Sequence, residues 1–126
     1  KRLERWDRAV SGVILPVHTD PSHPLGWGAG LGNLAGREFV LHIADLSFEP
    51  SDRFETITSF EQDLQAVSGV MSDAKLEELS SSSWLATATA GDGRVVLFAD
   101  DPLFRLMWPS QFILFAIALL LGPVMR

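Results

Sequence analysis

Cysteine is absent from this chain of 126 residues. The absence excludes disulfide bonds, thiolate zinc ligands and a cysteine nucleophile, because each of these needs a thiol. It does not assign a cellular compartment, since reducing and oxidising locations both tolerate a cysteine-free chain. Other side chains would therefore have to supply any chemistry.

Positive charge is scarce as well. Lys and Arg number 10 against 16 Asp and Glu, which gives a formal net charge of -6. The basic residues gather in one place only, at Lys1, Arg2, Arg5 and Arg8. Proteins that bind nucleic acid neutralise phosphates with a basic surface. The charge balance therefore argues against a nucleic-acid partner.

Apolar runs long enough to cross a membrane are missing too. The unbroken apolar run at residues 112–121 would cover about 15 Å as a helix, against roughly 30 Å of membrane hydrocarbon. We expect a helix that lies on a sheet, and keep a membrane anchor as an alternative that partitioning into detergent or lipid would reveal. Residues 1–8 are charged with no apolar segment after them, so we expect no signal peptide and a start inside a longer protein.

The composition, with 47% hydrophobic and 21% charged residues, is that of one globular domain. Apolar periodicity and turn residues divide its first half into alternating ordered and loop segments. Pro16 should place the first strand at a sheet edge or strand end. The expected segments are a helix end over 1–10, strands over 13–17 and 39–44, a weaker strand over 64–70, a loop over 19–36 and a polar surface excursion over 45–59.

The second half carries clearer local signals. Ser72 is a good N-cap for a short helix that ends at Leu79, and the four serines 80–83 suggest a flexible joint. Residues 84–90 and 95–99 flank Gly91-Asp92-Gly93, which predicts a β-hairpin. The apolar stretch 95–98 fits a central strand covered on both faces. Two helices should follow, one capped by Asp100 or Asp101 and one from Pro109 to Gly122. Together these segments predict a layered α/β domain, a sheet with flanking helices, a C-terminal hairpin and a closing helix.

The three histidines do not have the spacing of a zinc site. His18 and His23 are five residues apart in a proline-containing loop, and His42 lies in an apolar strand. We expect His23 to hydrogen-bond backbone and His42 to be a satisfied strand histidine. Asp20 and Ser22 adjoin His23, but adjacency in sequence does not make a triad.

A phosphate-binding loop is also not supported. Residues 30–35 match G-x-G-x-x-A, but that motif needs a strand before it and a helix after it. Here proline and tryptophan precede it and a strand is expected to follow, so we interpret it as a flexible loop.

Asp100, Asp101 and Arg105 are the remaining candidates. The two acids follow an apolar strand, where α/β proteins often place ligands. The alternative, which we favour, is that an acid before Pro102 caps a helix and that Arg105 pairs with Asp101 four residues earlier. Aromatic residues that could line a pocket or belong to the core are Trp27, Trp84, Phe98, Phe104 and Trp108.

Three stretches carry a family resemblance: SGVILPVHTDPSHPLGWG, FVLHIADLSFEPSD, and GDGRVVLFADDPLFRLMW followed by LLLGP. Together they resemble the C-terminal region of bacterial zinc carboxypeptidase-family proteins, over roughly residues 5–123. The strongest motif is GRVVLFADDPLFR and the second is HPLGWG. Neither is catalytic, so the resemblance depends on their order and spacing. In the family the last helix tends to be interrupted by arginine and asparagine, whereas residues 112–121 here contain neither.

The resemblance implies a partial domain similar to class I glutamine amidotransferases, which have a flavodoxin-like fold, placed after a metallocarboxypeptidase domain. It implies that the zinc ligands and the catalytic glutamate lie upstream, so that this segment holds no cofactor. It also implies a secreted or periplasmic location. No catalytic or metal-binding residue transfers to this chain, and an amidotransferase activity is excluded because that activity uses a cysteine.

We therefore expect residues 1–126 to be a single C-terminal accessory domain without catalytic activity of its own, in a parent protein that hydrolyses peptides. The expected partner is the upstream catalytic domain, with self-association through exposed apolar surface as an alternative. A different class of function also stays open. The chain could be a small-molecule or sugar-binding α/β module with a ligand near His23, in the HPLGWG loop, and near Asp100 and Asp101, with Arg105 close by.

Overall fold

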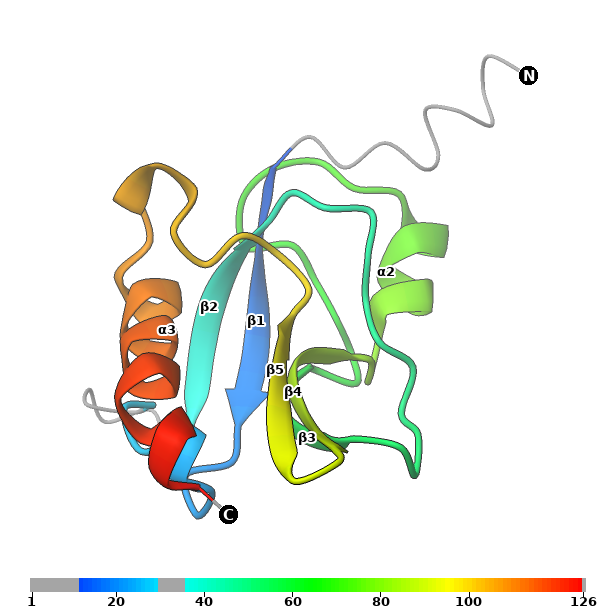
Figure 1. The fold of residues 1–126 in the computed structure, drawn as a ribbon. Helices are drawn as coiled ribbons and strands as arrows, with labels where there is room; N and C mark the ends of the chain where they lie inside the picture. Colours follow the sequence, from blue (N-terminus) through cyan, green and yellow to red (C-terminus); the bar gives the residue numbers. More distant parts are fainter. Residues whose placement is uncertain (1–11, 30–35, 126) are drawn as a thin grey trace.

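The computed structural model describes residues 12–29 and 36–125. These residues form a curled sheet of five strands in the order β2-β1-β3-β4-β5, and all neighbouring strands pair antiparallel (Figure 1). The predicted α/β class, a sheet with flanking helices, is thus confirmed. The strands are β1 (Val13–Thr19), β2 (Arg37–His42), β3 (Glu55–Phe60), β4 (Ser83–Ala90) and β5 (Gly93–Phe98).

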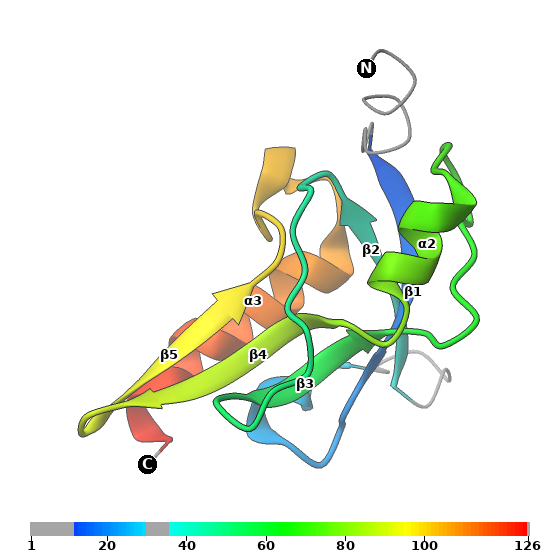
Figure 2. The same cartoon turned by 90° about the vertical axis from the view of Figure 1, so that its right-hand side faces the viewer.

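Within the described residues, two α-helices flank this sheet on opposite sides (Figures 1 and 2). They are α2 (Asp73–Leu79) and α3 (Pro109–Leu121), and three 3₁₀ turns accompany them: η1 (Pro24–Gly26), η2 (Phe104–Leu106) and η3 (Gly122–Val124). The helix end predicted over residues 1–10 and the glycine loop 30–35 lie outside the described residues.

The local signals of the second half of the chain are confirmed. Strands β4 and β5 form the predicted hairpin around Gly91, whose φ of 60° lies in the left-handed region. Ser72 caps α2, since its hydroxyl accepts a hydrogen bond from the Lys75 amide. Pro109 stands at the first turn of α3, and Gly122 is its C-cap. Each of these features is set by residues close together in the sequence.

Two predictions for the middle of the chain are wrong. The polar stretch 45–59 contains strand β3, and residues 64–70 hold a single isolated bridge, from Ser68 to Ile14, in place of a strand. In β3, Ile57 and Phe60 are buried while Glu55 and Thr56 are exposed. The strand carries few apolar side chains, and its shape depends on pairing with β1 and β4.

Strand β1 lies inside the sheet and Pro16 is its middle residue, so both positions predicted for Pro16, a sheet edge or a strand end, are wrong. On the side away from β2, the carbonyl of Pro16 accepts a hydrogen bond from the Glu61 amide at 3.4 Å, and the carbonyl of Ile14 accepts one from Val67 at 2.9 Å. Pairing with β3 begins only at Val17. Pro16 has no N–H to donate, but β3 does not extend alongside this residue, so no strand-pairing hydrogen bond is lost. An inner strand tolerates proline here for that reason.

Strand β5 is an edge strand, not the predicted central one. Its first residues are exposed, including Val95 with 43% of its surface accessible. The first of the two predicted C-terminal helices is also absent from the described residues, where only η2 forms. Arg105 and Leu106 both have φ of 51°, and two left-handed residues in a row cannot continue a right-handed helix.

The serines 80–83 form an ordered turn rather than a flexible joint. Ser81 has φ of 60°, and the hydroxyl of buried Ser82 donates to the Leu79 carbonyl at 2.6 Å. Ser83 is buried in β4, with its hydroxyl 2.5 Å from that of Thr56. Hydrogen bonds to α2 and β3 therefore fix a segment whose composition suggested mobility.

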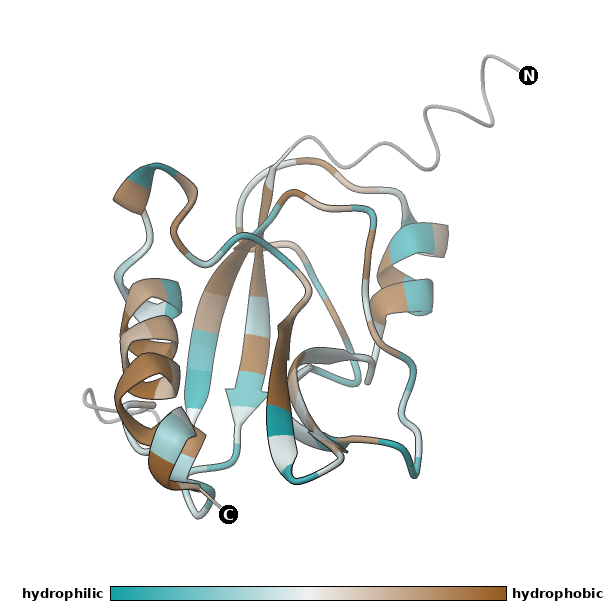
Figure 3. Cartoon of the chain, in the orientation of Figure 1, coloured by the Kyte–Doolittle hydropathy of each residue, from teal (hydrophilic) through white to brown (hydrophobic). Residues whose placement is uncertain are grey.

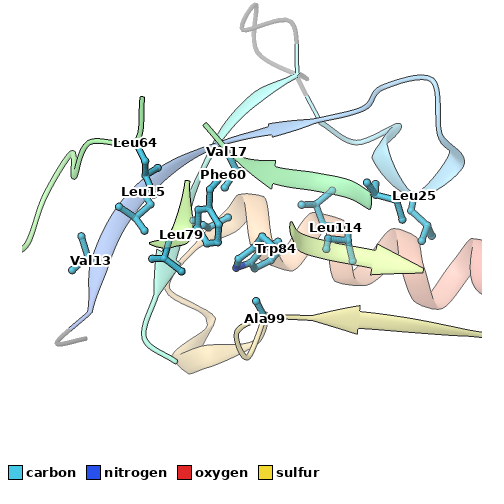
Figure 4. Close-up of a cluster of buried hydrophobic side chains, with 13 residues drawn as sticks. Val13, Leu15, Val17, Leu25, Phe60, Leu64, Leu79, Trp84, Ala99 and Leu114 are labelled. Carbon is cyan, nitrogen blue, oxygen red and sulfur yellow. The ribbon is translucent and has the colours of Figure 1, made fainter. Parts of the chain in front are cut away.

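The core fills the concave side of the curled sheet (Figure 4). Its largest member is Trp84, fully buried on β4, and Leu114 of α3 and Leu25 of η1 pack into the same cluster. The cluster of buried apolar residues comprises Val13, Leu15, Val17, Leu25, Val40, Ile57, Phe60, Leu64, Leu79, Trp84, Leu85, Ala99 and Leu114.

Helix α3 covers the outer edge of β2. The Phe39 carbonyl accepts hydrogen bonds from the Trp108 indole and from the Ser110 hydroxyl, and the Leu41 carbonyl accepts one from the Gln111 amide at 3.1 Å. Helix α3 also contacts β5, where the ring of Phe115 lies 6.1 Å from that of Phe98, the last residue of the strand. The polar groups of one sheet edge are thus satisfied by side chains in place of another strand.

Candidate functional site

Asp100 is the most highly connected of the predicted site residues. Its side chain is almost completely buried just after β5. Oδ2 lies 2.7 Å from Nδ1 of His42 and 2.8 Å from Nε1 of Trp84. Oδ1 accepts from the amides of Ile43 at 2.8 Å and Ala44 at 2.9 Å. One carboxylate thus accepts four hydrogen bonds.

These bonds join three parts of the sheet. His42 ends β2, Trp84 lies on β4, and Asp100 follows β5. Since β2 and β5 are the two outer strands of the described sheet, the carboxylate connects the ends of both across the curl. We call Asp100 with His42, Ile43, Ala44 and Trp84 the Asp100 latch. The latch therefore holds the ends of these two strands together. Asp100 does not cap a helix, contrary to our expectation.

The other nitrogen of His42 has no such partner. An ionised carboxylate only accepts hydrogen bonds, so Nδ1 of His42 is the donor to Asp100. Nε2 is buried without a hydrogen-bond partner among the described residues, and the imidazole stands edge-on to Phe60 with ring centroids 5.3 Å apart. The expectation of a satisfied strand histidine thus holds for one ring nitrogen and not for the other. Among residues 12–29 and 36–125, no serine hydroxyl bonds to Nε2, so no triad forms on this pair.

Burial of Asp100 favours its neutral form. The hydrogen bonds from His42, Ala44 and Ile43 outweigh this effect and hold the pKa of Asp100 below its ordinary value of 3.8. The ionised carboxylate is the form that the latch needs, because four donors surround it.

A pH dependence follows from the lowered pKa of Asp100. A carboxyl with a lowered folded-state pKa stabilises the protein above its unfolded value, and this contribution is lost as the pH falls through the folded-state pKa. We expect the urea midpoint of the wild-type protein to fall below about pH 3.8 more steeply than that of Asp100→Asn. The exposed control Asp101→Asn should keep the wild-type acid dependence; equal slopes for wild type and Asp100→Asn would contradict the assignment.

Asp101 and Arg105 are exposed, and neither takes part in the hydrogen bonds of the latch. Asp101 accepts a hydrogen bond from the Leu103 amide at 2.9 Å, which caps a turn. The Arg105 guanidinium lies over the ring of Phe104, 5.1 Å from its centroid. The structure shows no ion pair between Asp101 and Arg105, because the helix that would align them does not form there.

His23 has the backbone role that we predicted. Its Nδ1 accepts a hydrogen bond from the Leu25 amide at 3.1 Å and so caps η1. Its Nε2 lies 3.6 Å from a carboxylate oxygen of Glu55 on β3. The Ser22 hydroxyl donates to Asp20 at 2.6 Å rather than to His23, so these three residues do not form a triad.

The glycines of the HPLGWG loop allow it to pack closely. A Cβ on Gly26 would lie 2.0 Å from the Asp20 carbonyl oxygen, and one on Gly28 would lie 2.3 Å from Ile117 of α3. A side chain at either position would therefore push the loop away from the sheet or from α3. This close approach explains the glycines in structural terms.

The structure does not bring the predicted site residues into one place. His23 shares a pocket with Arg94, near the start of β5, whereas Asp100 follows the end of that strand. Arg94 and Asp100 therefore lie at opposite ends of β5. The sequence also gave no indication that Glu55 and Arg94 lie beside His23, because strand pairing brings them there.

Comparisons with known proteins identify no relative. No family model, no curated protein and no solved structure matches the chain. Across residues 12–29 and 36–125, no group of His, Asp and Glu side chains is arranged to hold a metal ion. No helix in that part of the chain has the length and apolarity to cross a membrane.

Proposed function

We propose that this chain is a non-catalytic accessory domain of a secreted or periplasmic zinc metallocarboxypeptidase-like protein. Zinc and the peptide-hydrolysing residues would belong to an upstream domain of the same polypeptide, which this domain supports or positions. The proposed family rests on the resemblance of GRVVLFADDPLFR and HPLGWG to the C-terminal region of such proteins.

The Asp100 latch is the observation that favours an accessory role. The strongest motif, GRVVLFADDPLFR, forms β5, Asp100 and η2. The one buried carboxylate in this motif is Asp100, and its hydrogen-bonding capacity is directed to backbone amides and to two side chains of the same fold. The motif that carries the resemblance therefore has a structural task in this chain.

An exposed apolar surface at and around α3 fits a domain that packs against another one. No charged residue occurs between Pro109 and Val124, and α3 is apolar along most of its length (Figure 3). A helix that is apolar on all sides is normally covered. We define the α3 face as the exposed residues Leu106, Met107, Phe112, Leu119, Leu120 and Val124, which have accessible fractions of 70, 59, 47, 62, 75 and 72%.

The resemblance also carries a finer fold assignment, a partial glutamine amidotransferase-like domain. Flavodoxin-like domains are built on a parallel sheet, whereas the described strands pair antiparallel. Under this assignment, the parallel strands would belong to the upstream part of the longer protein. A structure that includes that part would test it.

A peptidase assay tests the absence of catalysis. The purified chain with added zinc should not release C-terminal residues from peptides, whereas the longer protein should. Turnover by the chain alone that a single substitution in it abolishes would contradict the proposal.

A pair of surface variants tests the role of the α3 face. Leu120→Glu should weaken association with the separately produced upstream domain at least tenfold, because it places a charge on an apolar contact. Val70→Glu is the matched control, since Val70 is 82% exposed and lies before α2, away from α3. The alternative is that the α3 face mediates self-association, which light scattering on the chain alone would detect. A dimer that Leu120→Glu dissociates, while binding to the upstream domain is unchanged, would show self-association instead.

A further inference from the structure

The two edges of the described sheet differ in how their backbone groups are satisfied. At the β2 edge, the carbonyls of Phe39 and Leu41 accept hydrogen bonds from side chains at the start of α3. At the other edge, β4 is the only described strand that pairs with β5. Figure 2 shows the β4–β5 hairpin extending past the other strands, with β5 on its outer side. The β5 edge thus lacks the cover that the β2 edge has.

The register of the hairpin determines which backbone groups of β5 face this edge. A two-residue turn, 91–92, closes the hairpin, so the flanking residues Ala90 and Gly93 exchange hydrogen bonds, and every second pair along the hairpin does the same. The bond from the Ala99 amide to the Trp84 carbonyl, at 2.8 Å, agrees with this alternation. The residues whose N–H and carbonyl point away from β4 are therefore Arg94, Val96 and Phe98.

Val96 and Phe98 offer these outward groups to a new strand. Among the described residues, no main-chain hydrogen bond from outside the sheet reaches either of them. Arg94 already takes part in another interaction within the chain, so the free groups are those of the other two residues. A row of unpaired N–H and carbonyl groups on a sheet edge is a template for pairing with another strand.

Strand β5 also lacks most of the features that protect a sheet edge. Such features are prolines, bulges and charged side chains. The pairing of β4 with β5 runs without a shift, whereas that of β3 with β4 is interrupted. Residues 95–98 are all apolar, and Val95 is 43% exposed. This part of the edge is therefore regular, uncharged and suited to strand pairing.

We propose that β5 pairs antiparallel with β5 of a second copy of this chain, about a two-fold axis at Val96. In this register, Val96 lies opposite the partner's Val96, and Phe98 lies opposite the partner's Arg94. Every outward residue then faces an outward residue, whereas any other register leaves one of them opposite the turn or beyond the end of the strand. Both copies contribute the same surface, as a two-fold dimer requires.

The same register also suits the side chains. Val95 lies opposite the partner's Leu97, and the two-fold axis repeats this apolar pair. No like charges face each other, because Arg94 is opposite a phenylalanine. The dimer joins two five-stranded sheets into one and pairs both β5 edges. It uses the sheet edge and not the α3 face, so it goes beyond the proposed accessory role and does not depend on it.

Light scattering of the full chain over a range of concentrations tests for the dimer. Two strands of six residues make a small interface, for which we expect a Kd of about 100 μM. Val95→Lys places a charge at the edge and should raise the Kd at least about tenfold. Val70→Lys is the matched control, since Val70 is an exposed valine that precedes α2, and it should leave the Kd unchanged.

Two results of this experiment would overturn the proposal. One is a chain that stays monomeric up to about 1 mM, well above the Kd expected for a small interface. The other is a dimer that Val95→Lys leaves intact, including one that only Leu120→Glu dissociates, because self-association would then lie on the α3 face.

Disulfide cross-linking tests the register, because the chain has no cysteine of its own. Opposite residues of a non-hydrogen-bonded pair have Cα atoms about 4.5 Å apart, which a disulfide can span. A mixture of Val95→Cys and Leu97→Cys chains should therefore form a mixed disulfide dimer on mild oxidation. Either variant alone should cross-link at least about tenfold more slowly, because its two cysteines are diagonal neighbours about 7 to 8 Å apart. Equal rates for the mixture and the single variants would contradict this pairing.

Discussion

Replacement of Asp100 by alanine should lower the free energy of unfolding by about 3 to 5 kcal/mol, because it removes a buried ionised group from its hydrogen-bond network. The substitution leaves four buried donors without their acceptor: the amides of Ile43 and Ala44, Nδ1 of His42 and Nε1 of Trp84. An unsatisfied buried polar group carries the full cost of its desolvation. Urea unfolding followed by circular dichroism measures the loss.

Asp101→Ala is the matched control for this prediction. Asp101 is the adjacent residue, is exposed, and accepts one turn hydrogen bond. Its loss should cost about 0.5 to 1 kcal/mol. If Asp100→Ala does not fold, Asp100→Asn keeps the shape and one acceptor oxygen and should show a smaller loss of the same sign. Equal stabilities of the Asp100 and Asp101 variants would show that the latch does not stabilise the fold.

Local features of this fold could be predicted from the sequence because neighbouring residues determine them. Ser72 caps α2 with a hydroxyl three residues before the amide it binds, and Gly91 supplies the left-handed conformation of a hairpin turn. Pro109 and Gly122 mark the limits of α3. None of these features depends on what the rest of the chain does.

Features that depend on distant residues could not be predicted in this way. Strand β3 has only two fully buried apolar residues, Ile57 and Phe60, so its pattern resembles that of a polar loop. It is a strand because β1 and β4 lie on its two sides. The apolar residues of β5 suggested a central strand, but β5 lies at the edge of the described sheet, where Val95 is exposed and Phe98 contacts Phe115 of α3.

The same limit applies to the candidate sites. Asp100 was recognised as a candidate, but helix capping was expected because Pro102 follows it, and the real partners are 16 to 58 residues away in sequence. His23 was recognised together with its backbone role. The companions that give His23 a pocket, Glu55 and Arg94, come from two strands, and only the sheet register relates them.

Replacement of Trp84 by alanine should lower the free energy of unfolding by about 3 to 5 kcal/mol, because a large buried ring leaves a cavity behind. Trp84 is fully buried, and its ring stands edge-on to that of Phe98 with centroids 5.6 Å apart. Trp84→Phe keeps much of this packing but removes the indole N–H that donates to Asp100. It should cost about 1.5 to 3 kcal/mol, the range for a hydrogen bond to a charged group.

A double-mutant cycle separates the hydrogen bond of Trp84 from its packing. In an Asp100→Asn background, Trp84→Phe should cost at least 0.5 kcal/mol less than in the wild-type protein, because residues in one hydrogen-bond network are not additive. Trp108→Phe is the control: its indole donates to the Phe39 carbonyl and not to Asp100, so its cost should be the same in both backgrounds. If the losses of unfolding free energy of the two single variants simply add up in the double variant, the hydrogen bond from Trp84 to Asp100 does not contribute to stability. Packing alone would then hold the tryptophan, and the latch would consist of the bonds between Asp100 and the end of β2.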